Sequence, residues 1–137
     1  MGALHRKGRT LALLAVAALH GGAVACGVCI DDKVAAAYDH AGAISAVERH
    51  RIGVFAEVSG PREPKVLVLA AVRAAAAVRG IERASVRSAI APAVVSFVLD
   101  PAVRDPASAL AAVENGARPH VRLSLLKVLA GPARKGD

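Results

Sequence analysis

The chain has 137 residues and a mass of 13.9 kDa, which leaves room for one domain of ordinary size and excludes a large multidomain enzyme. Its residues are 55% hydrophobic, 21% charged and 2% aromatic, and its formal net charge is +7. The low aromatic content argues against nucleic-acid-binding modules that stack bases on Phe and Tyr.

The first 25 residues have the three-part pattern of a secretory signal peptide. A basic cluster at residues 5–9 precedes an apolar run from Leu11 to Leu19, and Ala23 and Ala25 form an A-x-A cleavage site. The apolar run is about half as long as a bilayer-spanning helix. Residues 1–25 are therefore assigned to a signal peptide and excluded from the fold.

Export places the mature chain in the bacterial periplasm or cell envelope, with extracellular release as the less favoured destination. Cleavage after Ala25 makes Cys26 the first residue, and bacterial lipoproteins also carry a Cys at this position. The lipobox is imperfect because Ala23 stands where Leu is usual. Soluble export is therefore preferred, and a lipid anchor at Cys26 is the alternative. The membrane is otherwise reached only through the signal peptide.

Removal of the signal peptide takes away three basic residues and lowers the net charge by three, from +7 to +4. No block of Lys and Arg that could follow a phosphate backbone remains in the mature chain. We therefore expect no nucleic-acid partner.

The apolar periodicity after the cysteines predicts a single helix over residues 32–50, with Asp31 or Asp32 as its N-cap. Tyr38 falls on the apolar stripe of this helix and is expected in the core. The next segment, residues 52–58, is predicted to form a strand.

The rest of the pattern alternates between helices and strands. The predicted elements are a helix over 65–79, strands over 84–90 and 94–99, a helix over 106–114 and a last strand from Val121 that continues, with a slip, to Val128. Asp105 is the expected N-cap of the second of these helices, and Pro106 is its first residue.

Read in order, these elements predict an α+β fold class. The order strand, helix, strand, strand, helix, strand is that of a ferredoxin-like βαββαβ sandwich, here with an additional N-terminal helix after the signal peptide. That extra helix packs on the open sheet face or edge, or stands off as an arm. The expected divisions are the signal peptide (1–25), the C-x-x-C segment with the extra helix (26–50), the ferredoxin-like domain (51–130) and a flexible tail (131–137).

Three segments within this pattern carry a resemblance: residues 78–86 (VRGIERASV), residues 92–97 (PAVVSF) and the pair Asp100-Pro101. They resemble the heavy-metal-associated domain family of copper chaperones and metal-ATPase amino-terminal modules, over about residues 52–126. The resemblance implies the ferredoxin-like fold and a role in metal trafficking. The family holds its metal with a C-x-x-C in the loop after the first strand. Here that loop, residues 59–65, has no Cys, and the pair lies earlier in the chain.

The displaced pair is Cys26-Gly27-Val28-Cys29, a spacing that lets two sulfur atoms face one another across a short turn. As thiolates they can hold Cu(I) in near-linear coordination, whereas Zn²⁺ requires two more ligands. The pair can also exchange electrons, or form a permanent disulfide in an oxidising compartment. Lipidation would consume Cys26 and abolish the two-sulfur site. His40 is the additional candidate ligand, although a regular helix would place it about 16 Å from Cys29.

The sequence does not predict an enzyme, because it contains no Gly-rich phosphate loop, no G-x-S-x-G and no H-E-x-x-H motif. We therefore expect an exported, non-enzymatic protein that binds or hands over a soft metal ion through Cys26 and Cys29. Cu(I) is the preferred ion, no other cofactor is expected, and an envelope protein is the further partner. Two alternatives stay open: a thiol–disulfide redox protein, and a lipid-anchored envelope interaction module.

Overall fold

A computed structural model describes residues 25–117 and 120–130. The helices are α1 (Ala25–Ala36), α2 (His40–Glu48), α3 (Pro64–Ala77) and α4 (Pro106–Gly116), and the strands are β1 (Ile52–Ser59), β2 (Arg87–Ala89), β3 (Val94–Leu99) and β4 (Arg122–Ala130). A short 3-10 turn, η1 (Arg83–Ser85), precedes β2. The predicted tail, residues 131–137, and the predicted signal peptide apart from Ala25 lie outside the described residues.

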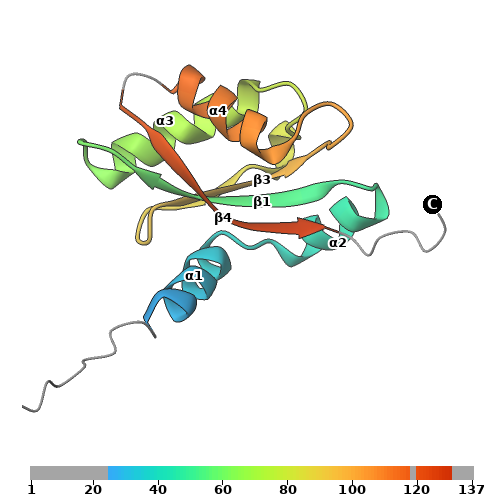
Figure 1. Cartoon of the computed structure of the whole chain (residues 1–137), viewed down its shortest axis with the longest axis horizontal. Helices are drawn as coiled ribbons and strands as arrows, with labels where there is room; N and C mark the ends of the chain where they lie inside the picture. The colour runs from blue at the N-terminus through green and yellow to red at the C-terminus, as the bar shows by residue number, and fades with distance from the viewer. Residues whose placement is uncertain (1–24, 118–119, 131–137) are drawn as a thin grey trace, which may run out of the picture.

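The strands form one antiparallel sheet of four strands in the order β2-β3-β1-β4, so that β1 is central and β4 is an edge. Helices α3 and α4 cover one face of this sheet, and α1 and α2 lie on the other (Figure 1). The α+β class and the antiparallel four-stranded sheet predicted from the sequence are thus confirmed. The architecture is compatible with a ferredoxin-like fold.

The core lies between the sheet and the α3–α4 layer. Alternate residues of the two inner strands point into it, because side chains of a strand alternate between faces. The helices meet them mainly with small side chains, so the layers approach closely. The buried core residues include Val54, Ala56 and Val58 of β1, Val95, Phe97 and Leu99 of β3, Ala71, Ala74 and Ala75 of α3, and Leu110 and Val113 of α4.

Most elements of this layer follow the predicted pattern. Helix α4 begins at Pro106 and is capped as expected, because the Asp105 carboxylate accepts a hydrogen bond of 2.9 Å from the Ser108 N–H. Strand β4 runs through Val128 to Ala130, and its register against β1 shifts between Phe55 and Ala56. The predicted slip is therefore a β-bulge.

The strand expected over residues 84–90 is mostly wrong, because only Arg87–Ala89 is a strand. The Ser85 hydroxyl donates to the Glu82 carbonyl at 2.6 Å and accepts from the Val98 N–H at 2.8 Å. A side chain thus replaces the backbone as the partner of β3, and residues 83–85 turn instead of extending.

The single helix expected over residues 32–50 is also wrong, because the chain forms α1 and α2 with a break at residues 37–39. Asp39 caps α2 by accepting a 3.2 Å hydrogen bond from the Gly42 N–H. The proposed caps Asp31 and Asp32 lie inside α1. The break lets α2 lie across the open sheet face, one of the positions considered for the extra helix (Figure 1).

The C-terminus of α2 closes in a Schellman motif. The Arg51 N–H donates to the Ala46 carbonyl at 2.8 Å, and the His50 N–H donates to the Val47 carbonyl at 3.2 Å. This motif requires a left-handed residue at the first position beyond the cap, and His50 has φ 55°. His50 therefore occupies a position that favours glycine.

We expect His50→Gly to stabilise the protein by about 0.5–1 kcal/mol, because glycine adopts the left-handed conformation without steric strain. Urea unfolding followed by circular dichroism measures this free energy. His50→Ala is the matched control: it also removes the imidazole but keeps a Cβ, so it should show no gain. Equal unfolding midpoints for the two variants would contradict the assignment.

A second constraint lies in the loop after β1, at Gly60. Its φ is 156°, and a Cβ at this residue would collide with the His120 carbonyl oxygen and lie 3.0 Å from Leu67 Cδ2. The loop thus packs directly against the backbone that leads into β4. A side chain at this position has no space.

We expect Gly60→Ala to lower the free energy of unfolding by about 1–3 kcal/mol, because the backbone of one of the two segments must move. Gly53→Ala is the matched control, since a Cβ there meets its nearest neighbours, Leu129 and Phe55, at an ordinary 3.6 Å. Chemical denaturation of the two variants and the parent tests this. A Gly60→Ala protein as stable as Gly53→Ala would show that the close approach is wrong.

Candidate functional site

The predicted thiol pair lies in helix α1. Cys26 is its second residue and Cys29 its fifth, so the pair belongs to the helix itself and does not form the short turn before it that the spacing suggested. Residues three apart on a helix are neighbours on its surface, about 4.5 Å apart along its axis. The backbone therefore brings Cys26 and Cys29 to one side of the first turns of α1.

The second half of α1 is attached to the sheet. Val34 and Ala37 are buried, and Lys33 Nζ forms a 2.8 Å ion pair with Glu57 Oε2 on β1. Asp31 lies 4.0 Å from Lys127 Nζ of β4 and is otherwise exposed. The start of α1, which carries the cysteines, points away from the sheet (Figure 1).

His40, the additional candidate ligand, is the first residue of α2. It is exposed, and its Nδ1 lies 3.3 Å from the Tyr38 hydroxyl. Within residues 25–117 and 120–130, no three His, Cys, Asp or Glu side chains are grouped so that they could hold a metal ion. The structure therefore gives His40 a local partner in Tyr38 and does not bring it into a ligand cluster.

The resemblance noted in the sequence would place a metal site in the loop between β1 and α3. Residues 59–65 contain no Cys, and Gly60 within them packs against the His120 backbone. Any thiol chemistry must therefore come from α1, on the opposite face of the sheet from the α3–α4 layer (Figure 1).

A second candidate site, which the sequence analysis missed, is a pocket of about 380 Å³ between α2 and the sheet. Its volume lies in the range of small-molecule sites. The wall is mostly apolar, with contributions from Tyr38, Ile44 and Val47 on the helical side and from Phe55, Val98 and Leu129 on the strands.

Tyr38 belongs to this pocket and not to the core, so its predicted place was wrong. Its side chain is 44% exposed, and its ring stacks on Phe55 with centroids 6.4 Å apart and planes 20° apart. The break after α1 turns the residue away from the helical stripe on which it was placed. It lines the pocket instead.

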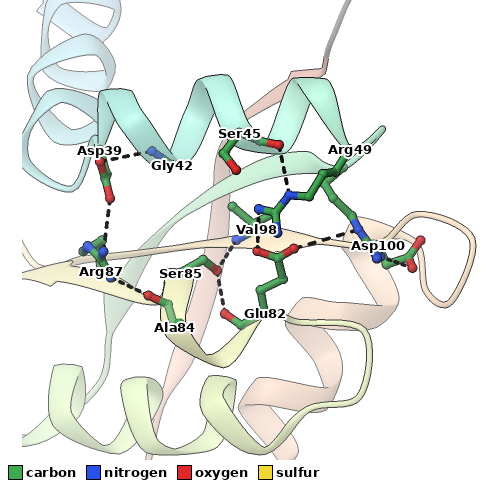
Figure 2. Close-up of polar contacts among 11 residues, drawn as sticks. Asp39, Gly42, Ser45, Arg49, Glu82, Ala84, Ser85, Arg87, Val98 and Asp100 are labelled. Atoms are coloured by element: carbon green, nitrogen blue, oxygen red, sulfur yellow. Dashed lines mark hydrogen bonds and ion pairs between the residues drawn. The ribbon is translucent and has the colours of Figure 1, made fainter.

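Ion pairs hold α2 over the sheet at both ends (Figure 2). At the N-terminus Asp39 Oδ2 lies 3.1 Å from Arg87 Nη2 of β2. Beyond the C-terminus, Arg49 Nη2 lies 3.0 Å from Glu82 Oε2. These contacts fix the ends of the helix, and residues from Asp39 to Glu48 contribute to the pocket wall.

The contact at the C-terminal end continues into a small charge network. Arg51 pairs with Asp100, and its buried Nε lies 3.9 Å from Glu82 Oε1 without a hydrogen-bond partner in the described structure. Two guanidinium groups therefore share Glu82, which joins the end of α2 to the segment before η1. This network positions α2 and offers no open polar site.

The sequence did hint at the pocket, because the segment that forms α2 carries large apolar side chains. Both Ile44 and Val47 belong to the apolar stripe that predicted the helix. In the structure Ile44 is 49% exposed and Val47 is 38% exposed. Only knowledge of where α2 lies on the sheet turns these residues into the wall of a pocket.

None of the helices within the described residues has the length and apolar character needed to cross a membrane. Comparison of the chain with protein-family models, with curated proteins and with solved structures finds no match.

Proposed function

We propose that residues 51–130 form a ferredoxin-like domain related to the heavy-metal-associated family. Three observations support this. The elements follow the order strand, helix, strand, strand, helix, strand, and the sheet order β2-β3-β1-β4 places the first and third strands in the centre. Both connecting helices cover one face, as they do in that fold (Figure 1). The family relationship is proposed from the segments quoted above.

The function that we propose is binding or hand-over of a soft metal ion, Cu(I), through Cys26 and Cys29. One observation carries it: the two residues lie one turn apart at the start of α1, the end that points away from the sheet. Two thiolates suit Cu(I), which accepts soft ligands in low coordination number, whereas Zn²⁺ prefers four ligands. A partner that gives or receives the ion would meet the chain at this end of α1.

The same proposal assigns the protein to the bacterial periplasm or cell envelope, as a non-enzymatic carrier with an envelope protein as its partner. The support is the signal-peptide pattern of residues 1–25, which ends directly before Cys26. Membrane contact would then come only from the signal peptide, or from a lipid on Cys26.

Two other functions use the same residues. The start of a helix favours a thiolate, which supports thiol–disulfide exchange, while the nearby Asp31 and Asp32 oppose it. A lipid on Cys26 would leave Cys29 alone and make the chain an anchored interaction module. Each alternative predicts a different covalent state of Cys26.

The first measurement is the intact mass of the protein isolated from the cell envelope after expression of the full chain. We expect cleavage after Ala25 without a lipid adduct. A diacylglyceryl group on Cys26 would overturn the two-thiol site and support the anchored module.

Cu(I) titration against a competing chelator then tests the site in the reduced protein. We expect one tight site that is lost in Cys26→Ser and in Cys29→Ser and is unchanged in the control His40→Asn. Affinity unchanged by the cysteine variants would refute metal binding through the pair. A reduction potential below about −300 mV would identify a disulfide that stays closed and exclude redox exchange.

A further inference from the structure

We infer that the pocket between α2 and the sheet is a binding site for a small apolar molecule that is neutral or cationic. This goes beyond the proposed metal function and does not depend on the cysteines, because the pocket is lined from Ala37 onwards and none of its walls comes from the start of α1.

Helix α2 leaves part of the space between itself and the sheet open. Protein interiors are normally filled to crystal-like density, and a helix lying on a sheet closes its gap with side chains. Here Ala46 is the buried residue of α2, whereas Ile44 and Val47 line an open space of about 380 Å³. The ion pairs at Asp39 and Arg49 hold the helix in place over that space (Figure 2).

The polar groups in the pocket wall form hydrogen bonds within the protein. The Ser96 hydroxyl donates to the Ala37 carbonyl at 2.7 Å, and the Ser85 hydroxyl both donates and accepts within the protein. Arg87 is paired with Asp39 and also donates to the Ala84 carbonyl. These groups already have protein partners, so the wall selects a ligand that needs few hydrogen bonds.

The charged side chains of the pocket wall also limit which ligand can bind. Asp39 and Arg87 neutralise one another, whereas Glu48 lines the pocket without an ion-pair partner among the described residues. The lining side chains therefore carry one net negative charge, on the exposed Glu48 carboxylate. A carboxylate ligand would be repelled there, while a neutral or cationic end group would not.

The test uses three eight-carbon probes that differ only in the end group: octan-1-ol, octylammonium and octanoate. Binding to the full mature protein is followed by titration calorimetry and by amide chemical shifts. We expect octan-1-ol to bind with a dissociation constant on the order of 0.1–1 mM. Octylammonium should bind at least as tightly, and octanoate about threefold or more weakly.

Two variants locate the site. Gly53→Val adds a side chain to the pocket floor, where a Cβ makes ordinary 3.6 Å contacts, and Val favours a strand. Octan-1-ol binding should be lost while the unfolding temperature is not lowered. Val47→Glu, at a position 38% exposed, should weaken octan-1-ol binding by fivefold or more, about the effect of a carboxylate placed in an apolar wall.

The matched control is Val66→Glu on α3, at a side chain that is 50% exposed and outside the pocket. It should leave octan-1-ol binding unchanged. Absence of octan-1-ol and octylammonium binding, equal loss of binding in Val66→Glu and Val47→Glu, or tightest binding of octanoate would each overturn the inference. None of these results would alter the Cu(I) titration.

Discussion

The hydrogen bond from the Ser96 hydroxyl to the Ala37 carbonyl is the contact on which the arrangement of the N-terminal segment depends. It joins the inner strand β3 to the break between α1 and α2 at 2.7 Å. Ser96 is the only buried polar side chain among the residues that the structure describes. A buried hydroxyl without a partner would be costly, so the sheet and the break must meet at this point.

Both candidate sites follow from this contact. On one side of the break, α1 leaves the sheet and carries Cys26 and Cys29 outwards. On the other side, α2 crosses the sheet face and is held by its ion pairs above the pocket. The proposed metal site therefore lies on α1, while the pocket lies between α2 and the sheet. The two sites share an attachment but not a residue that carries their chemistry.

The sequence predicted the α3–α4 layer well, because its signals are local. Asp105 and Pro106 start α4 through their own capping and backbone geometry, and the apolar run at residues 94–99 forms β3 with the expected bounds. The strand predicted over 84–90 failed because Ser85 finds its partners at Glu82 and Val98, and that second partner is distant in the chain.

The candidate sites could not be predicted to the same extent. The apolar stripe over residues 32–50 is continuous, and the break at 37–39 arises from the Asp39 cap together with a partner on β3 that lies 59 residues away from Ala37. Tyr38 was therefore assigned to the core and the pocket was missed. For the thiol pair, the spacing indicated two neighbouring sulfur atoms. It did not indicate that a helix carries them, and the direction in which that helix points depends on its packing against the sheet.

The most direct test of this account is amide hydrogen exchange in Ser96→Ala, with Ser88→Ala on the exposed part of β2 as control. Loss of the hydroxyl leaves the Ala37 carbonyl without its partner, which corresponds to about a threefold to tenfold shift in the local opening equilibrium. The account predicts faster exchange by that factor throughout α2, with β1 and α3 unchanged and no effect of Ser88→Ala. Unchanged protection of α2 in Ser96→Ala would contradict it, as would an equal loss of protection across the whole sheet.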